Sequence, residues 1–209
     1  MAVLTIHHQK GGVGKSTLTL YLYNYYSRAG LNCAIIDSDP QGSINSLVDV
    51  LKGDLKGVKV IRRQDFTSWK KLKLLNYDLI LVDTPPYTSP DLSDIFDISN
   101  LILVPTKAGV FDLLALKPTI RLIRQAMKKR KHLKAAVVLN MVVPNNEFIK
   151  QMRRALEKKG LPVLHTEIGN RVSYSRALLA DGGIFAEKNE KATAEMRKLA
   201  VEIIDFLNK

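Results

Sequence analysis

Short runs of apolar residues alternate along the chain with longer segments in which apolar residues recur at helical spacing. The apolar runs predict strands at residues 2–7, 33–37, 58–61, 78–83, 100–104, 135–140 and 162–164. The segments with helical spacing predict helices at residues 16–29, 43–51, 66–75, 112–131, 146–159, 173–180 and 190–207. Such alternation is typical of strand–helix–strand units on a parallel sheet. We therefore expect an α/β fold with a doubly wound, mainly parallel sheet flanked by helices on both faces.

Two apolar runs indicate the centre of this sheet. Residues 79–82 and 101–104 are apolar throughout rather than alternating, as expected of central strands covered on both faces. Gly30 and Gly160 directly follow predicted helices, where a left-handed C-cap residue favours glycine. No internal repeat or Gly/Ser linker interrupts the pattern. We expect residues 1–209 to form a single domain.

Composition narrows the class of protein. The chain has 209 residues, of which 46% are hydrophobic, and this is enough to bury a core. Cys33 is its only cysteine, which excludes an intramolecular disulfide and any metal site built on cysteine pairs, and favours a cytoplasmic location. No apolar run reaches the roughly 18 residues of a membrane span, and the N-terminus lacks the features of a signal peptide. We therefore expect no membrane partner.

Charge is the most informative part of the composition. The 32 Lys and Arg residues exceed the 20 Asp and Glu residues by 12, and the isoelectric point is about 9.8. Such an excess attracts polyanions and is typical of proteins that bind nucleic acid. The alternative is a surface rich in solvated lysine, as in salt-tolerant or heat-tolerant proteins.

A glycine-rich loop follows the first predicted strand. Its sequence, K-G-G-V-G-K-S-T from Lys10, matches the phosphate loop G-x-x-x-x-G-K-[ST] only if the first glycine is relaxed. In such a P-loop the backbone N–H groups and the helix start face the phosphates, while Lys15 supplies a positive charge. The hydroxyl of Ser16 can bind Mg2+, and that of Thr17 can donate to the α-phosphate. The residues expected to hold a nucleotide are Gly11, Gly12, Val13, Gly14, Lys15, Ser16 and Thr17.

With Lys10 at its start, this loop resembles that of the deviant Walker A ATPases. In that family the matching lysine reaches the nucleotide of a partner subunit. The resemblance implies an ATP-bound homodimer in which Lys10 supplies charge in trans, as an arginine finger does. The alternative for Lys10 is a solvated loop lysine.

Two acidic segments extend the resemblance. Asp37 and Asp39 stand in a D-x-D-P-Q segment, which implies that Asp37 holds a Mg2+-bound water and that Asp39 orients the attacking water. Asp83 ends an apolar strand as a Walker B acid does, where a carboxylate without a metal or partner would be costly. A turn-forming Asp-Pro pair and a helix N-cap are the respective alternatives. With ATP and Mg2+ as cofactors, the implied catalytic residues are Lys10, Lys15 and Asp39, and the implied metal residues are Ser16, Asp37 and Asp83.

The resemblance runs from residue 2 to about residue 207. The segment P-x-x-x-x-x-x-D-L-x-A, which begins at Pro105, is similar to one in plasmid and chromosome partition ATPases. Asn140, at a predicted strand end, should contact adenine by its family position, or else serve as a turn residue. Gly109 stands where a guanine-selecting motif would have aspartate, so ATP is favoured over GTP.

The single cysteine excludes the relatives that need cysteine pairs, such as iron–sulfur carriers. The remaining resemblance is to short ParA/Soj-like partition ATPases without an N-terminal helix-turn-helix domain. It implies a weak ATPase that dimerises around ATP, binds nucleoid DNA without sequence preference, and moves plasmid or chromosomal DNA with a centromere-binding, ParB-like partner. Two alternatives stay open: a MinD- or McdA-like ATPase that positions a non-DNA cargo, and a ligase similar to dethiobiotin synthetase.

Candidate DNA contacts lie on late helices. Arg121, Arg124 and Lys128 have spacings of three and four, which place them on one helix face. Arg171 and Arg176 lie in a segment that resembles the family's DNA-facing region. Further basic residues that extend the first group are Lys129, Arg130, Lys131 and Lys134. Each of these residues alone could equally be a solvated charge, so only the group as a whole indicates DNA binding.

Two groups of residues are expected to do no chemistry. The tyrosines of the first predicted helix are too dispersed around it to face one groove, so packing on the sheet is favoured over base stacking. His7 and His8 have no metal-ligand spacing with the other histidines.

Overall fold

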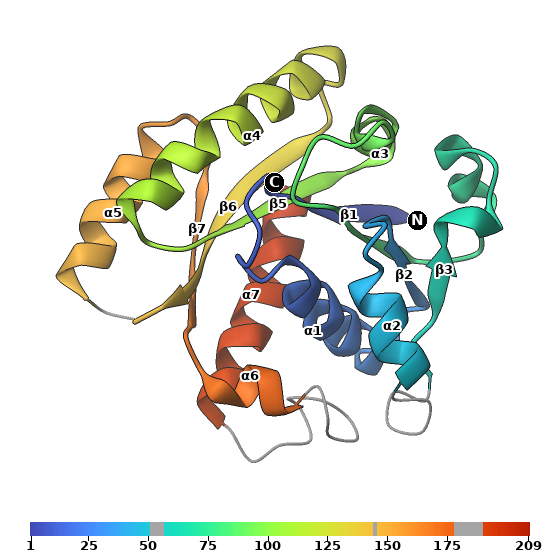
Figure 1. Cartoon of the computed structure of the whole chain (residues 1–209), viewed down its shortest axis with the longest axis horizontal. Coiled ribbons are helices and arrows are strands. Elements are labelled where there is room, and N and C mark those ends of the chain that lie inside the picture. Colours follow the sequence, from blue (N-terminus) through green and yellow to red (C-terminus); the bar gives the residue numbers. More distant parts are fainter. Residues whose placement is uncertain (51–56, 144–145, 178–189) are drawn as a thin grey trace.

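A seven-stranded sheet forms the centre of the computed structural model, which describes residues 1–50, 57–143, 146–177 and 190–209 (Figure 1). The strands are β1 (Ala2–Ile6), β2 (Cys33–Asp37), β3 (Val60–Arg62), β4 (Leu79–Asp83), β5 (Leu101–Thr106), β6 (Lys134–Val142) and β7 (Val163–Gly169). Their order across the sheet is β3-β2-β4-β1-β5-β6-β7, and every neighbouring pair runs parallel. The predicted doubly wound parallel sheet is thus confirmed, with β1 at its centre.

Helices cover both faces of this sheet, as Figure 1 shows. On one face lie α1 (Lys15–Arg28), α2 (Ser43–Val50), α6 (Val172–Arg176) and α7 (Glu190–Asn208). On the other lie α3 (Leu92–Ile98), α4 (Val110–Lys129) and α5 (Glu147–Glu157). No described helix is long and apolar enough to cross a membrane.

The strands beside β1 show why their sequences are apolar throughout. Every residue of β4 and β5 is buried. Because successive side chains of a strand point to opposite faces, Leu79 and Leu81 pack in the layer of α1 and α7, while Ile80 and Val82 pack in the layer of α3 and α4. A strand buried on both faces needs apolar residues at every position.

The structure corrects two of the predicted elements and adds one α-helix. The helix expected at 66–75 is instead a 3-10 segment, Trp69–Leu74, in which Trp69 and Leu72 bury side chains three residues apart. Helix α3 was not predicted, because its seven residues are too few to show a clear period. Strand β7 continues to Gly169, past the polar residues 165–167 that ended the predicted strand. The ends predicted at residue 51 and at 178–180 lie outside the described residues.

The tyrosines of α1 pack on the sheet as predicted. Tyr21, Tyr23 and Tyr26 are buried. Two of their hydroxyls form hydrogen bonds in the core. Tyr21 donates to the Tyr174 carbonyl of α6, and Tyr26 donates to the Ala200 carbonyl of α7 at 2.9 Å. These contacts fix α1, and with it the loop that precedes it.

Candidate nucleotide-binding site

The ends of three neighbouring strands bring the predicted site together. Asp37 at the end of β2 pairs in register with Asp83 at the end of β4, and Asp83 pairs in register with Ile6 of β1. Carboxyl ends of parallel strands meet at one edge of a sheet, which is where ligands bind in open α/β folds. The glycine-rich loop leaves β1 at this edge, next to both carboxylates.

The backbone of this loop suits an anion. Gly12 and Gly14 have φ of 66° and 89°, a region that favours glycine. Gly14 is the N-cap of α1 and offers no side-chain cap, so the first N–H groups of the helix are not satisfied by a capping side chain. Such uncapped N–H groups, together with the helix dipole, form a binding site for phosphate.

Asn140 braces the loop from β6. It is 4% exposed, and its side-chain amide donates to the Val13 carbonyl at 2.7 Å. A Cβ at Gly14 would overlap that amide nitrogen. Met141, the next residue, has φ of 55°, and the two residues lie within a shift of the β6–β7 register. The adenine contact of Asn140 stays a prediction.

Lys15 lies inside the site with little access to water. The residue is 8% exposed, and its Nζ donates to the Lys10 carbonyl at 3.3 Å. Burial lowers the pKa of its ammonium, which the charges of Asp83 and Asp39 raise in part. An ammonium that has lost its water gains strongly from an incoming phosphate.

Asp83 and Ser16 form the metal side of the site. Ser16 donates its hydroxyl to Asp83 Oδ2 at 2.6 Å. Burial raises the pKa of Asp83 to about 7, although the hydrogen bond from Ser16 lowers it. Asp37 is also buried, and burial raises its pKa too, against hydrogen bonds from the backbone N–H groups of Asn45, Asp39 and Ile44. Two of these N–H groups belong to the start of α2.

These residues fit a magnesium ion. A hydroxyl and two carboxylates are the hard oxygen donors that Mg2+ prefers, and Mg2+ keeps several waters besides. Burial makes the negative charge of Asp83 costly, and a divalent cation would offset that cost. Asp39 lies half-buried in the loop after β2 and accepts from the Gln41 N–H at 3.0 Å. Its backbone N–H donates to Asp37 Oδ1 at 3.2 Å, which places it beside the other carboxylates, and its charge raises the pKa of both Lys15 and Asp83.

Lys10 forms an ion pair within its own chain. Its Nζ lies 2.5 Å from Asp112 Oδ1 in the first turn of α4, with side-chain exposures of 36% and 11% respectively. His8 accepts the Lys10 backbone N–H on Nδ1 at 2.8 Å. We did not predict this role for Asp112 from the sequence. The available signal was its position as an acid in the first turn of a helix that starts at the carboxyl edge.

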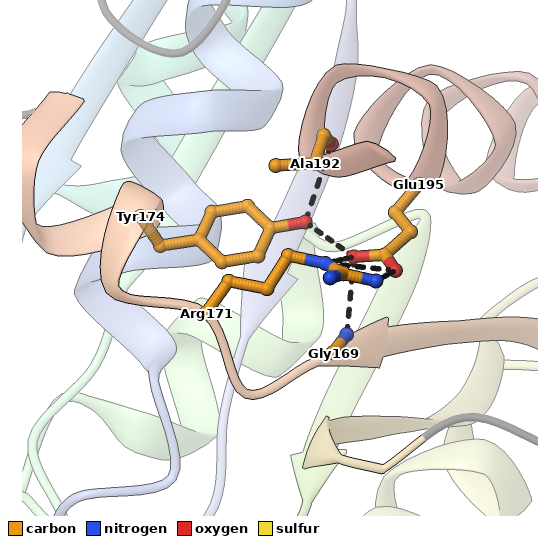
Figure 2. Close-up of polar contacts among 5 residues, drawn as sticks. All are labelled: Gly169, Arg171, Tyr174, Ala192 and Glu195. Carbon is orange, nitrogen blue, oxygen red and sulfur yellow. Dashed lines mark hydrogen bonds and ion pairs between the residues drawn. The ribbon is translucent and has the colours of Figure 1, made fainter. Parts of the chain in front are cut away.

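The predicted DNA contacts divide between the two faces of the sheet. Arg121, Arg124 and Lys128 are exposed on α4. Arg171, which precedes α6 in the layer of the opposite face, is ion-paired with Glu195 at 2.5 Å (Figure 2). Figure 2 also shows the Gly169 N–H and the Tyr174 hydroxyl donating to this carboxylate. Arg176 is exposed on α6. The five residues therefore do not form one surface.

Two further predicted members of the basic surface hold helix ends instead. Arg130 donates to the Phe96 and Ser99 carbonyls at the end of α3. Lys134 donates to the Phe206 and Leu207 carbonyls at the end of α7. Carbonyls at the end of a helix lack the regular helical partner, so these cations supply donors there, in addition to the Ser99 N–H that also reaches the Phe96 carbonyl at 3.3 Å.

Comparison with known proteins finds similarity along most of the chain. Residues 4–182 match the model of a family described as the CobQ/CobB/MinD/ParA nucleotide binding domain. The maintenance of carboxysome distribution protein A of Halothiobacillus neapolitanus is 30% identical over 207 residues, which covers 96% of this chain and 95% of that protein. The chromosome-partitioning ATPase Soj of Thermus thermophilus is 29% identical over 154 residues, which covers 56% of this chain and 62% of that protein.

The fold has close counterparts among solved structures. A putative plasmid partition protein from Borrelia burgdorferi, bound to AMPPNP, superposes with a TM-score of 0.73. The match covers 98% of both chains at 20% identity. This likeness shows the fold.

Proposed function

This chain belongs to the CobQ/CobB/MinD/ParA family of nucleotide-binding domains, and we propose that it is a weak Mg2+-dependent ATPase that works as a switch. In the ATP-bound state it forms a homodimer around the nucleotides, binds DNA without sequence preference, and positions plasmid or chromosomal DNA in the cytoplasm. A centromere-binding, ParB-like partner stimulates turnover. The observation that carries the proposal is the convergence of the uncapped start of α1, Lys15 and the Ser16–Asp83 pair at one sheet edge.

The residues of the site divide the work of phosphoryl transfer. The loop N–H groups and Lys15 would hold the phosphates, while Ser16, Asp83 and Asp37 would hold Mg2+ with its waters. The chemistry supplied at this position would be neutralisation of phosphate charge. Asp39, on a loop at the same edge, orients the attacking water. Each of these residues would bind or position a reacting group, which is the main contribution that a protein makes to phosphoryl transfer.

Lys10 links the site to a second copy. Its ion pair with Asp112 keeps the ammonium in its own chain until a second nucleotide-loaded copy offers a stronger anion. Lys10 then leaves Asp112 and reaches the phosphates of that copy, where its charge stabilises the transition state. The dimer is therefore part of the catalytic machinery.

A second candidate shares the switch but not the cargo. The relative in Halothiobacillus neapolitanus, which aligns along 95% of its length, is named for the distribution of carboxysomes. This favours a positioning ATPase whose cargo is not DNA. Deleting the gene separates the two candidates: loss of DNA inheritance supports the first, whereas a clustered cargo body with normal inheritance supports the second.

Calorimetry with Mg2+ and a non-hydrolysable ATP analogue, combined with sedimentation, tests the switch itself. We expect ligand uptake and pairing of subunits in the native protein, and neither in Lys15→Ala. Asp39→Ala should bind the analogue and DNA but lose hydrolysis. If Asp39→Ala loses DNA binding as completely as Lys15→Ala, Asp39 serves nucleotide capture and its assigned role is wrong. A ligase of the dethiobiotin synthetase kind would show no effect of DNA on turnover.

A further inference from the structure

A basic groove lies between α4 and the end of α5. It has a volume of about 560 Å³ and is lined by Lys117, Ile120, Arg121, Arg124, Gln125, Lys128 and Lys159. Among these lining residues of the described chain, five carry a positive charge and none is acidic. Lys117 and Lys159 add to the two arginines and one lysine that were predicted from the sequence. Like charges gathered in a concave surface create a strong local attraction for an anion.

The spacing of the groove matches an extended anion rather than a single phosphate. Positions 117, 121, 124 and 128 follow each other at four, three and four residues, so they form one row along α4. The row is about 16 Å long at 1.5 Å per residue. At about 3.4 Å of axial rise per phosphate on one DNA strand, this length corresponds to about five phosphates.

Arg124 is held in place within this row. One of its terminal nitrogens donates to the Lys159 carbonyl at 2.7 Å. Gly160 makes room for this contact, because a Cβ at that position would overlap the guanidinium. A guanidinium has five N–H donors, so most of them stay available to phosphate oxygens. A preset side chain also loses less conformational entropy on binding.

Basic residues rather than apolar residues make up most of the lining of the groove. Ile120, its only apolar lining residue in the described chain, is 5% exposed. The remaining contacts come from basic side chains and one amide, a composition suited to a phosphodiester backbone. On the opposite face, the predicted contact Arg171 is already paired with Glu195.

We infer that this groove, with Lys117, Arg121, Arg124, Lys128 and Lys159, is the surface that binds the DNA backbone. The inference rests on the proposed function, and it assigns the non-specific DNA contact to α4 instead of α6. Asp112 stands at the start of the same helix, so the row begins less than two turns from the residue that holds Lys10.

The test removes three charges from each face and compares the results. The groove variant is Lys117→Gln, Arg121→Gln and Lys128→Gln. The control is Arg176→Gln, Arg197→Gln and Lys198→Gln, which removes the same net charge from exposed residues of α6 and α7. Retention on a random-sequence duplex is measured with ATP across a salt series, alongside ATP affinity and a melting curve for each protein.

Each phosphate contact contributes about 0.9 to the slope of log affinity against log salt. We expect the groove variant to lose about 2 to 3 from this slope and at least tenfold in affinity, while the control loses less than about 1 from the slope. Equal losses in both variants would mean that net charge alone retains DNA, and no loss in the groove variant would place the contact elsewhere. Either result overturns the inference.

Two further outcomes are distinguishable. If the native protein captures ATP but is not retained on DNA at any salt, the proposed DNA-binding function fails, and the assignment of the groove fails with it. If polyglutamate competes as well as DNA for the native protein and the groove variant loses both, the groove takes an acidic protein and the DNA assignment is overturned.

Discussion

Gly14 adopts φ of 89° and lies against the side-chain amide of Asn140, so a methyl group there meets both backbone strain and overlap. We expect Gly14→Ala to lower the free energy of unfolding by about 2 kcal/mol or more. Gly11→Ala is the matched control, because only Pro86 Cβ comes as near as 4.0 Å and φ lies outside the left-handed region. It should cost less than about 0.5 kcal/mol. Melting curves without nucleotide measure both, and equal costs would contradict the role given to Asn140.

If Lys10 acts in the partner's site, its ion pair with Asp112 opposes the proposed dimer, because the lysine must leave that pair. Asp112→Asn removes the negative charge but keeps a similar shape. A partly exposed pair contributes about 0.5 kcal/mol and a dimer gives up two such pairs, so the variant should dimerise about fivefold more readily with a non-hydrolysable ATP analogue. Sedimentation across a protein concentration series measures the shift. Weaker dimerisation of Asp112→Asn would show that Asp112 supports the dimer.

The buried histidines make stability sensitive to acid. Burial, together with the charge of Lys15, lowers the pKa of His7 to about 3 and that of His8 to about 4. Each therefore binds a proton in the unfolded chain near pH 6.5 but resists it when folded, so each reduces stability as pH falls from 6.5 toward 4. Asp83, with its pKa raised to about 7, acts in the opposite direction, because the folded chain takes up its proton first.

A substitution isolates the contribution of one histidine. His8→Asn keeps an acceptor for the Lys10 N–H but cannot be protonated. Between pH 6 and pH 4.5, its unfolding free energy should fall less steeply than that of the native protein, by about 1.4 kcal/mol per pH unit. Urea unfolding at several pH values measures the two slopes. Parallel slopes would mean that His8 is protonated in the folded protein as readily as in the unfolded one.

At this scale the sequence predicted the residues of the loop but not their supports. Gly14, Lys15, Ser16 and Asp83 follow from short motifs, because the chemistry of phosphate and metal fixes their types and spacing. The contact of Lys10 with Asp112 joins residues 102 positions apart, and local spacing carries no information about it.

Among the elements, the junction of β7, α6 and α7 depends on Glu195. Burial alone would raise the pKa of this carboxylate, but hydrogen bonds from Arg171, the Gly169 N–H and Tyr174 lower it overall. Glu195→Gln should therefore lower the free energy of unfolding by about 1–3 kcal/mol, because the half-buried Arg171 loses its counter-charge. The exposed pair of Arg62 and Asp49 is the control, and Arg62→Gln should cost less than about 1 kcal/mol.

Urea unfolding distinguishes these two variants. Similar small costs would show that the network in Figure 2 is no stronger than a surface pair. The same network shows that Arg171, one of the predicted DNA contacts, has a counter-charge within the chain. Its partner, Glu195, is 24 residues away on another helix, and the local spacing of residues does not predict such a contact.

The elements themselves were predictable where burial imposes a pattern. β4 and β5 are buried at every position, so their continuous apolar runs identified them as central strands. β7 ran further than predicted because Glu202 of α7 accepts the backbone N–H groups of His165 and Thr166, a tertiary contact that lets polar residues stay in the strand. The seven residues of α3 offered too little length for a helical period.

For the whole molecule, trans action of Lys10 gives a test by mixing. Lys10→Ala keeps its own nucleotide loop and Asp39, while Asp39→Ala still binds nucleotide and keeps a working Lys10. If Lys10 serves the partner's site, a mixture of the two inactive variants forms heterodimers with one complete site and regains part of the ATPase activity. Turnover measured across mixing ratios should peak when both are present. A mixture as inactive as its components would place Lys10 in cis.

The bracing of the loop by Asn140 ties the nucleotide site to the far half of the sheet. Val13 rests on a side chain of β6 at the point where the register with β7 shifts. A ligand that reduces the mobility of the loop should therefore also reduce the mobility of the irregular β6–β7 pairing around residues 139–142. Amide protons around residues 139–142 should accordingly exchange with deuterium more slowly once a nucleotide is bound.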